Sequence, residues 1–132
     1  MSKPTPADAP KLASLAHAVA ADGDFGAAQA AAQMATTADP KCFDAWVMLG
    51  LAHAKQNKPS RAAPCFVKAL ELRPDDVACW TDLGECLTML MDYPRAAAAF
   101  RQAMLLDPNA DHPSGRRARA VVGRTIALLR KG

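Results

Sequence analysis

Apolar side chains recur every three or four residues along most of this chain, in segments separated by short polar breaks. This spacing places the apolar side chains of each segment on one face of an α-helix. Gly, Pro, Asp and Asn stand at the breaks, where they favour helix ends and turns. The pattern therefore predicts consecutive helices over residues 9–21, 26–38, 42–56, 60–72, 76–90 and 94–107.

The middle of the chain repeats itself. A shift of 34 residues superimposes Trp46 on Trp80, Leu49 on Leu83, Gly50 on Gly84, Ala62 on Ala96, Phe66 on Phe100, Ala69 on Ala103 and Pro74 on Pro108. Residues 9–42 keep the pattern loosely, with alanine in place of the large residues. Glycine and alanine let two helices approach closely, and the aromatic residues fill the space beside them. We therefore expect helical hairpins that stack on one another.

Two positions depart from this pattern. Met91 stands in the third predicted turn at the place that Gly23 and Asn57 occupy in the other two. Glycine and asparagine tolerate a left-handed backbone better than methionine, so we expect either an exposed, strained methionine or a third turn of different shape. Pro64 lies inside a predicted helix, where it removes a backbone donor. That helix either begins late or bends at Pro64.

After residue 110 the chain changes character. A linker that contains Pro113 is followed, from Arg116 onward, by apolar residues at helical spacing. These are Ala118, Val121, Val122, Ile126 and Leu129. An amphipathic helix of this kind can cover the apolar face that a last repeat leaves open. We expect a flexible leader over residues 1–8, repeats over 9–42, 43–76 and 77–110, and a linker with a capping helix over 111–132.

The spacing of the repeated residues resembles the consensus of the tetratricopeptide repeat (TPR), a helix-turn-helix unit of 34 residues. The residues that carry the resemblance are Trp46, Leu49, Gly50, Ala62, Phe66, Ala69 and Pro74, with their counterparts in the next repeat. The resemblance covers residues 9–110. It implies an all-α fold, with three tandem TPR repeats plus a C-terminal capping helix in a right-handed α-solenoid. It does not identify the partner, which surface residues select in such scaffolds.

Composition narrows the class of protein further. Hydrophobic residues make up 51% of the 132 residues and aromatic residues only 5%, which suits close-packed helices in one domain. No run approaches the roughly 18 apolar residues of a membrane span. Residues 1–10 also lack the apolar core of a signal peptide. We therefore expect a cytoplasmic protein with no membrane span.

Residues that could carry chemistry are scattered along the chain. The cysteines are Cys42, Cys65, Cys79 and Cys86, and the histidines are His17, His53 and His112. The cysteines form no CxxC pair and have no histidine at metal-ligand spacing, so we expect buried thiols, with a reactive or regulatory thiol as the alternative. His53 takes the place of Val19 and Leu87 in the other repeats, which favours a packed side chain over a ligand. With no phosphate-binding or hydrolase motif present, we expect no enzyme, no cofactor and no metal.

Positive charge gathers near the end of the chain. Residues 111–132 hold six basic side chains and one acidic one, whereas the whole chain has a net charge of +3. The basic residues are Arg116, Arg117, Arg119, Arg124, Arg130 and Lys131. Nucleic-acid binding would also need aromatic or motif support, which the sequence lacks. A solvated helix face is the first interpretation, an acidic protein partner the second, and RNA or a membrane surface the third.

In TPR proteins, ligands usually lie along the concave face formed by the first helix of each repeat. The resemblance places there Ala13, His17, Ala20, Val47, Leu51, Ala54, Thr81, Glu85 and Thr88. Family members that clamp the carboxylate tail of heat-shock chaperones carry Lys, Asn and Arg at such positions. This chain has none of these residue types at the nine positions. A shallow groove of small and apolar side chains instead suits an extended peptide.

A narrower resemblance rests on three repeats plus a closing helix, and on the string Gly84-Glu85-Cys86-Leu87. In these features the chain is similar to the class II chaperones of bacterial type III secretion systems. Those proteins hold hydrophobic translocator subunits in the cytoplasm before export. From residues 1–8 we expect no longer amino-terminal extension of the kind through which many of them dimerise, and a homodimer stays open. The hypotheses are a peptide-binding secretion chaperone, a scaffold or adaptor in a multiprotein complex and, third, nucleic-acid binding through the basic helix.

Overall fold

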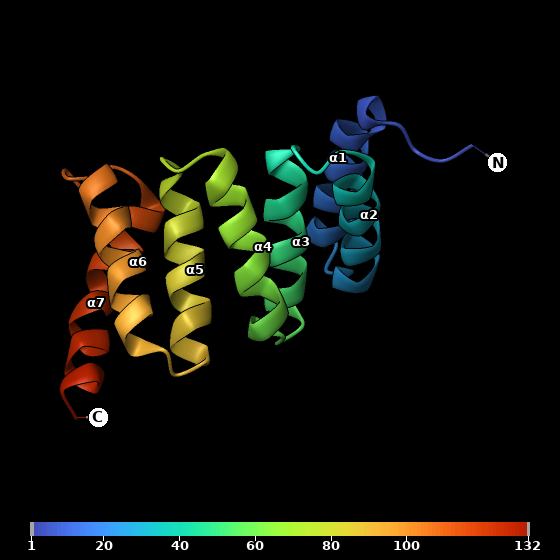
Figure 1. Cartoon of the computed structure of the whole chain (residues 1–132). Helices are drawn as coiled ribbons and strands as arrows, with labels where there is room; N and C mark the ends of the chain where they lie inside the picture. Colours follow the sequence, from blue (N-terminus) through green and yellow to red (C-terminus); the bar gives the residue numbers. More distant parts are fainter. Residues whose placement is uncertain (1, 132) are drawn as a thin grey trace. The chain divides into compact units, whose positions relative to one another are not determined.

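A computed structural model describes residues 2–131, and this part of the chain is helical with no strand. A short 3-10 helix at Pro6–Asp8 precedes α1 (Ala9–Ala21), α2 (Phe25–Ala38), α3 (Phe43–Lys55), α4 (Pro59–Leu72), α5 (Val77–Met89), α6 (Tyr93–Leu106) and α7 (Pro113–Lys131). Figure 1 shows these helices coloured by their position along the chain. Helices α1 to α6 begin and end within one residue of the predicted positions, whereas α7 begins three residues earlier than Arg116.

The described residues form two compact units, each with its own core. Residues 2–72 contain α1 to α4, and residues 73–131 contain α5 to α7. In the first unit, α3 packs against both helices of the α1–α2 hairpin. In the second, α7 packs in the same way against both helices of the α5–α6 hairpin. Helix α7 therefore takes the place that the first helix of a following repeat would occupy.

A glycine packed against a phenylalanine ring lies at the centre of a hairpin in each unit. Phe66 and Phe100 are almost completely buried. A Cβ atom on Gly50 would lie 2.8 Å from the Phe66 ring, and one on Gly84 would lie 2.6 Å from the Phe100 ring. Any larger residue at either glycine would push the ring aside. The repeated glycines are therefore required by the close approach of the two helices.

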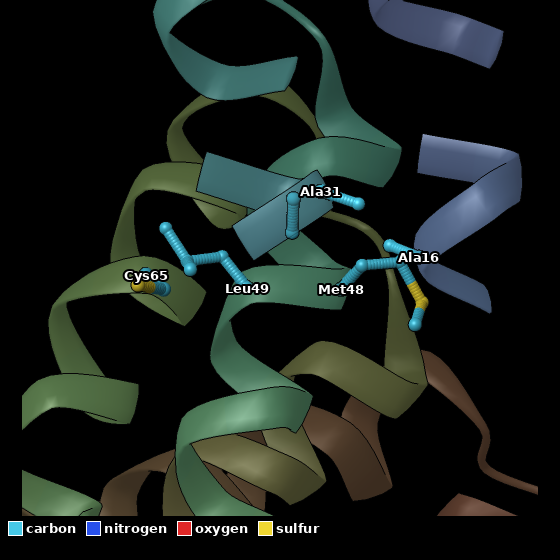
Figure 2. Packing of buried hydrophobic residues seen from close by; sticks show 6 residues of the cluster. Ala16, Ala31, Met48, Leu49 and Cys65 are labelled. Atoms are coloured by element: carbon cyan, nitrogen blue, oxygen red, sulfur yellow. The ribbon is translucent and has the colours of Figure 1, made fainter. Parts of the chain in front are cut away.

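The first unit also contains an alanine-rich cluster that joins its two hairpins. Figure 2 shows Ala16, Ala31, Met48, Leu49 and Cys65 meeting there. The alanines of α1 and α2 have little side-chain volume, so the larger Met48 and Leu49 of α3 provide much of the apolar contact. The first repeat thus relies on the second to bury its apolar face.

The two tryptophans contribute less to the core than their repeated positions suggest, because both are only partly buried. The Trp46 ring nitrogen donates a hydrogen bond to the Pro40 carbonyl at 2.7 Å, and that of Trp80 donates to the Pro74 carbonyl at 2.8 Å. Each indole thus fixes its helix to the preceding loop. The phenylalanines, and not the tryptophans, fill the closest helix contact.

All three hairpin turns have the same shape, so the expectation of a different third turn is wrong. Gly23, Asn57 and Met91 have φ angles of 85°, 61° and 60°. The Met91 amide donates to the Thr88 carbonyl at 3.0 Å, and the next amide donates to the Leu87 carbonyl at 2.8 Å. The other two turns repeat this pair of bonds, which ends a helix with a left-handed residue. Met91 adopts this backbone with its side chain 74% exposed.

Pro64 lies inside α4, which begins at Pro59, so the expectation of a late start is wrong. The proline removes the amide that would donate to the Ser60 carbonyl one turn earlier. Both Pro64 and Ser60 are exposed, so water can reach this part of the helix. The helix tolerates the proline on its solvent side.

The predicted leader contains an ordered turn near α1. The Thr5 amide and hydroxyl both donate hydrogen bonds to the Asp8 carboxylate, at 2.8 and 3.2 Å. The 3-10 helix at Pro6–Asp8 packs against α1 and α2. Met1 and Gly132, at the ends of the predicted leader and capping helix, lie outside the described residues. Over residues 2–131, no helix combines the length and apolar character that crossing a membrane requires.

Candidate functional site

A groove with a volume of about 260 Å³ lies between α1 and α3 in the first unit. Its lining residues are Pro10, Ala13, Ser14, His17, Asp44, Val47 and Met48. We call it the α1–α3 groove. Small and apolar side chains are interspersed with one carboxylate, one imidazole and one hydroxyl, so the groove offers both apolar contact and hydrogen bonding.

Three of the predicted peptide-binding residues, Ala13, His17 and Val47, come together in this groove. Leu51 and Ala54 are partly buried and do not line it. Leu51 packs instead against the alanine-rich cluster.

Sequence reasoning missed Pro10, Ser14, Asp44 and Met48. Each lies three positions before a predicted residue, and so shares its helix face. Including the residue one helical turn before each predicted residue would have found them.

The second unit has a groove of its own, with a volume of about 390 Å³. Its lining residues are Glu85, Thr88 and Met89 of α5, Phe100 of α6, and Val121, Arg124, Thr125 and Leu128 of α7. We call it the α5–α7 groove. It brings together the predicted residues Glu85 and Thr88. The signal for the α7 residues was available in the repeat length, which aligns Ala118 with Gly84 and Val121 with Leu87.

One end of the α5–α7 contact is closed by hydrogen bonds. Thr81 has no exposed surface, and its hydroxyl donates to the Ser114 carbonyl at 2.9 Å. Arg117 of α7 donates to Asp82 at 2.9 Å and also to Glu85. A ligand cannot reach Thr81 in this arrangement, so the prediction that Thr81 contacts a ligand does not fit this structure.

The start of α7 is fixed by a buried carboxylate. Asp107 accepts hydrogen bonds from the amides of Asp111 and His112, both at 3.0 Å. A Cβ on Gly115 would lie 2.0 Å from the Asp107 carboxylate, so only glycine fits there. The Ser114 amide donates to Nδ1 of His112 at 3.0 Å. Because these bonds use backbone amides and not the Ser114 hydroxyl, the group holds the helix start and does not form a nucleophile–base pair.

His53 is packed, with 8% of its surface exposed. Its Nδ1 atom is buried and has no hydrogen-bond partner. Burial lowers the pKa of His53, and the nearby Lys58 and Arg61 lower it further. The imidazole is therefore neutral at physiological pH. Over residues 2–131, no three His, Cys, Asp or Glu side chains gather in a way that could hold a metal ion.

The four cysteines are thiols rather than disulfides. Burial raises the pKa of Cys65 to about 11. Burial raises the pKa of Cys79 further still, with Asp76 adding to the effect. Because the thiolate is the nucleophile, both buried thiols are unreactive at neutral pH.

The sequence model of the tetratricopeptide repeat family matches residues 14–63 and 47–113, well over half of the chain. The chain belongs to the tetratricopeptide repeat family. A curated relative is the chloroplastic TPR domain-containing protein PYG7 of Arabidopsis thaliana, which is 31% identical over 61 residues. That match covers 46% of this chain and 20% of the relative, so this TPR chain spans only a small part of it.

Solved TPR structures have the same fold. The first TPR domain of Spaghetti (RPAP3), bound to the HSP90 peptide SRMEEVD, has a TM-score of 0.85 and 16% identity and covers 98% of each chain. The Yersinia enterocolitica type III secretion chaperone SycD, in complex with a peptide of the translocator YopD, has a TM-score of 0.77 and 18% identity. That match covers 93% of this chain and 94% of SycD. At these identities the similarity shows the fold alone, and it confirms the predicted all-α TPR class.

Proposed function

We propose that this chain is a non-catalytic protein-interaction module that binds an extended peptide segment in the α1–α3 groove. The observation that carries the proposal is the composition of that groove. Val47 offers apolar surface, with Ala13 and Met48 mostly buried behind it, while the exposed His17 and Asp44 can form hydrogen bonds with a peptide backbone. Small residues on α1 leave room for the side chains of the bound segment.

Two proteins of the same fold support a peptide ligand, since RPAP3 was solved with an HSP90 peptide and SycD with a translocator peptide. The lining residues of the α1–α3 groove include no Lys, Asn or Arg that could hold a terminal carboxylate. We therefore favour a segment with apolar anchors, as a cytoplasmic chaperone of a hydrophobic secreted protein would bind. The second candidate function is an adaptor in a multiprotein complex, which the separate α5–α7 groove favours.

Fluorescence anisotropy with two peptides tests the proposal. The probes are the YopD peptide that SycD binds and the HSP90 peptide SRMEEVD. We expect the first to bind and the second not to bind. Lack of binding by the YopD peptide would argue against the secretion-chaperone role. Co-purification from the native host with mass spectrometry would then identify the partner of an adaptor.

A matched pair of variants tests the location of the site. Val47 lines the groove, whereas Val67 is exposed on α4 of the same unit and does not line it. We expect Val47→Glu to weaken peptide binding at least about tenfold, or 1.4 kcal/mol. Val67→Glu should bind like the unmodified chain. Equal losses in the two variants would remove the α1–α3 groove from the proposal.

A further inference from the structure

The α5–α7 groove differs in chemistry from the α1–α3 groove, and it lies in the other unit. We propose that it binds an acidic peptide segment that inserts a large apolar side chain between α5 and α7. The two halves of this proposal rest on separate observations, which are the apolar lining of the groove and the charge of α7.

The lining suits a large apolar anchor. Met89 and Leu128 are 50% and 40% exposed, although both are large apolar residues. Val121 is partly buried beside them, and Phe100 contributes to the lining from α6. A volume of about 390 Å³ is large enough for a leucine or phenylalanine side chain. Covering Met89 and Leu128 would remove apolar surface from water, which favours binding.

The basic charge around this lining favours a peptide with acidic residues next to the apolar side chain that enters the groove. Helix α7 carries six basic side chains and no acidic one. Glu85, the one acid that lines the groove, already accepts a hydrogen bond from Arg117. Within the described residues, no carboxylate pairs with Arg124, Arg130 or Lys131.

The helix dipole explains only part of this charge. Basic residues in a last turn compensate the partial negative charge of the helix end, which accounts for Arg130 and Lys131. Arg124 lies about two turns earlier, beyond the reach of that effect, and it lines the groove. Arg124 is therefore the residue that we assign to a carboxylate of the bound segment.

A peptide fits these features better than a nucleic acid. RNA-binding surfaces combine basic residues with aromatic side chains on which bases stack. Phe100, the one aromatic residue that lines the groove, is only 1% exposed and offers no stacking face. The exposed apolar surface comes from Met89 and Leu128, which bind the side chains of a peptide more readily than bases.

The test measures the anisotropy of a fluorescein-labelled, glutamate-rich helical peptide of about twelve residues with two leucines at i and i+4. Matched peptides replace the leucines by serine or the glutamates by lysine. We expect the acidic leucine peptide to bind at least about tenfold more tightly than either matched peptide. Equal binding of the serine peptide would overturn the apolar anchor, and equal binding of the lysine peptide would overturn the charge selection.

Variants locate the site, each with a control on α6 of the same unit. Arg124→Glu should weaken binding of the acidic peptide at least about tenfold and strengthen binding of the lysine peptide. Arg101→Glu, at an exposed arginine outside the groove, should have little effect. Leu128→Ser should weaken binding, whereas Leu105→Ser, at a residue 72% exposed, should not. Equal effects of a variant and its control would overturn the proposal.

Two further measurements separate this site from the alternatives. Val47→Glu should leave binding of the acidic peptide unchanged, so failure of the α1–α3 proposal would not affect this one. An RNA oligomer should bind more weakly than the peptide at physiological salt, and equal affinity would overturn the choice of a peptide. Sedimentation of the chain alone should give a monomer. A dimer that Leu128→Ser dissociates would assign the groove to a second copy instead.

Discussion

Helices α1 and α3 of the first unit pack together as α5 and α7 of the second unit do, but the surface of each pair is different. In the first unit, Ser14 and His17 of α1 line an open groove beside α3. Two repeat lengths later, α5 carries Asp82 and Glu85 at the same positions. These two carboxylates hold Arg117 of α7, so the corresponding part of the α5–α7 contact is closed.

The contrast shows which residues determine the fold and which determine the surface. The glycine–phenylalanine contact is the same in the second and third hairpins. The turn residue of each hairpin also has the same left-handed backbone conformation. Ser14 and His17 in α1 and their counterparts Asp82 and Glu85 in α5 differ in charge, and none of the four is buried. The same scaffold can therefore present a groove lined by Ser14, His17 and Asp44 in one unit, and in the other a groove whose apolar lining lies next to basic residues of α7.

The largest expected effect tests whether the cores of the two units are equivalent. Phe66→Ala and Phe100→Ala each remove a buried ring that packs against a glycine, so each should lower the unfolding free energy by about 3 to 5 kcal/mol. Trp46→Ala and Trp80→Ala should cost less, because both indoles are partly exposed. Urea denaturation followed by circular dichroism measures all four. A larger loss for a tryptophan than for its phenylalanine would reverse the packing roles assigned here.

The next effect concerns a position where the repeats differ in the core. His53 has a buried nitrogen without a partner, and the equivalent residue of the third repeat is Leu87. An unsatisfied buried polar atom costs about 1 to 3 kcal/mol, so His53→Leu should raise the unfolding free energy by that order. Thermal melts at neutral pH provide the measurement. Leu87→His is the matched reverse change and should destabilise the chain.

The same histidine predicts a pH dependence. Its pKa is lowered in the folded chain, chiefly by burial, from an ordinary value of 6.5. The unfolded chain therefore takes up a proton at higher pH than the folded chain does, and the unfolding free energy falls as the pH drops below about 6.5. His53→Leu should flatten this fall. An unchanged acid profile in the variant would assign the effect to other groups.

A smaller effect concerns the turns, which have one shape but three different residues. Met91→Gly relieves a left-handed backbone at a residue with a Cβ atom and should raise the unfolding free energy by about 0.5 to 1 kcal/mol. Gly23→Met introduces the same conflict into the first turn and should lower it by a similar amount. Differential scanning calorimetry resolves both shifts. A loss of stability in Met91→Gly would mean that the exposed methionine makes favourable contacts.

The smallest expected effect concerns the ion pairs that close the α5–α7 contact. The Arg117 side chain is 44% exposed, so solvent screens its pairs with Asp82 and Glu85. Arg117→Gln should therefore lower the unfolding free energy by only roughly 0.5 kcal/mol at low salt, and by less at high salt. Melting at two salt concentrations measures the difference. A salt-independent loss would show that packing of the arginine stem, and not charge, holds α7.

Much of the fold was predictable because local signals and the repeat agree. Gly23 and the aspartates that begin several helices mark the turns, and the repeat extends those signals to the neighbouring units. Met91 was misjudged because local propensity favours another turn, whereas the hydrogen bonds of the hairpin impose the repeated one. Propensity is a weak guide where tertiary contacts select the backbone.

The candidate site was less predictable, because it depends on contacts between distant segments. Ala13, His17 and Val47 follow from the repeat register, and the structure places them in one groove. The burial of Thr81 depends on Ser114, 33 residues away along the chain, and on how α7 packs. Spacing within one helix shows which residues share a face, but it does not show which partner covers that face.

The paired indole bonds have a spectroscopic consequence. The chain has two tryptophans, and Trp46 lies in the first unit while Trp80 lies in the second. Each ring nitrogen is bound to a proline carbonyl at the entrance of its helix, so emission from each indole reports on the integrity of its own unit. Replacing either tryptophan by phenylalanine would leave a single fluorophore and allow the unfolding of each unit to be followed separately.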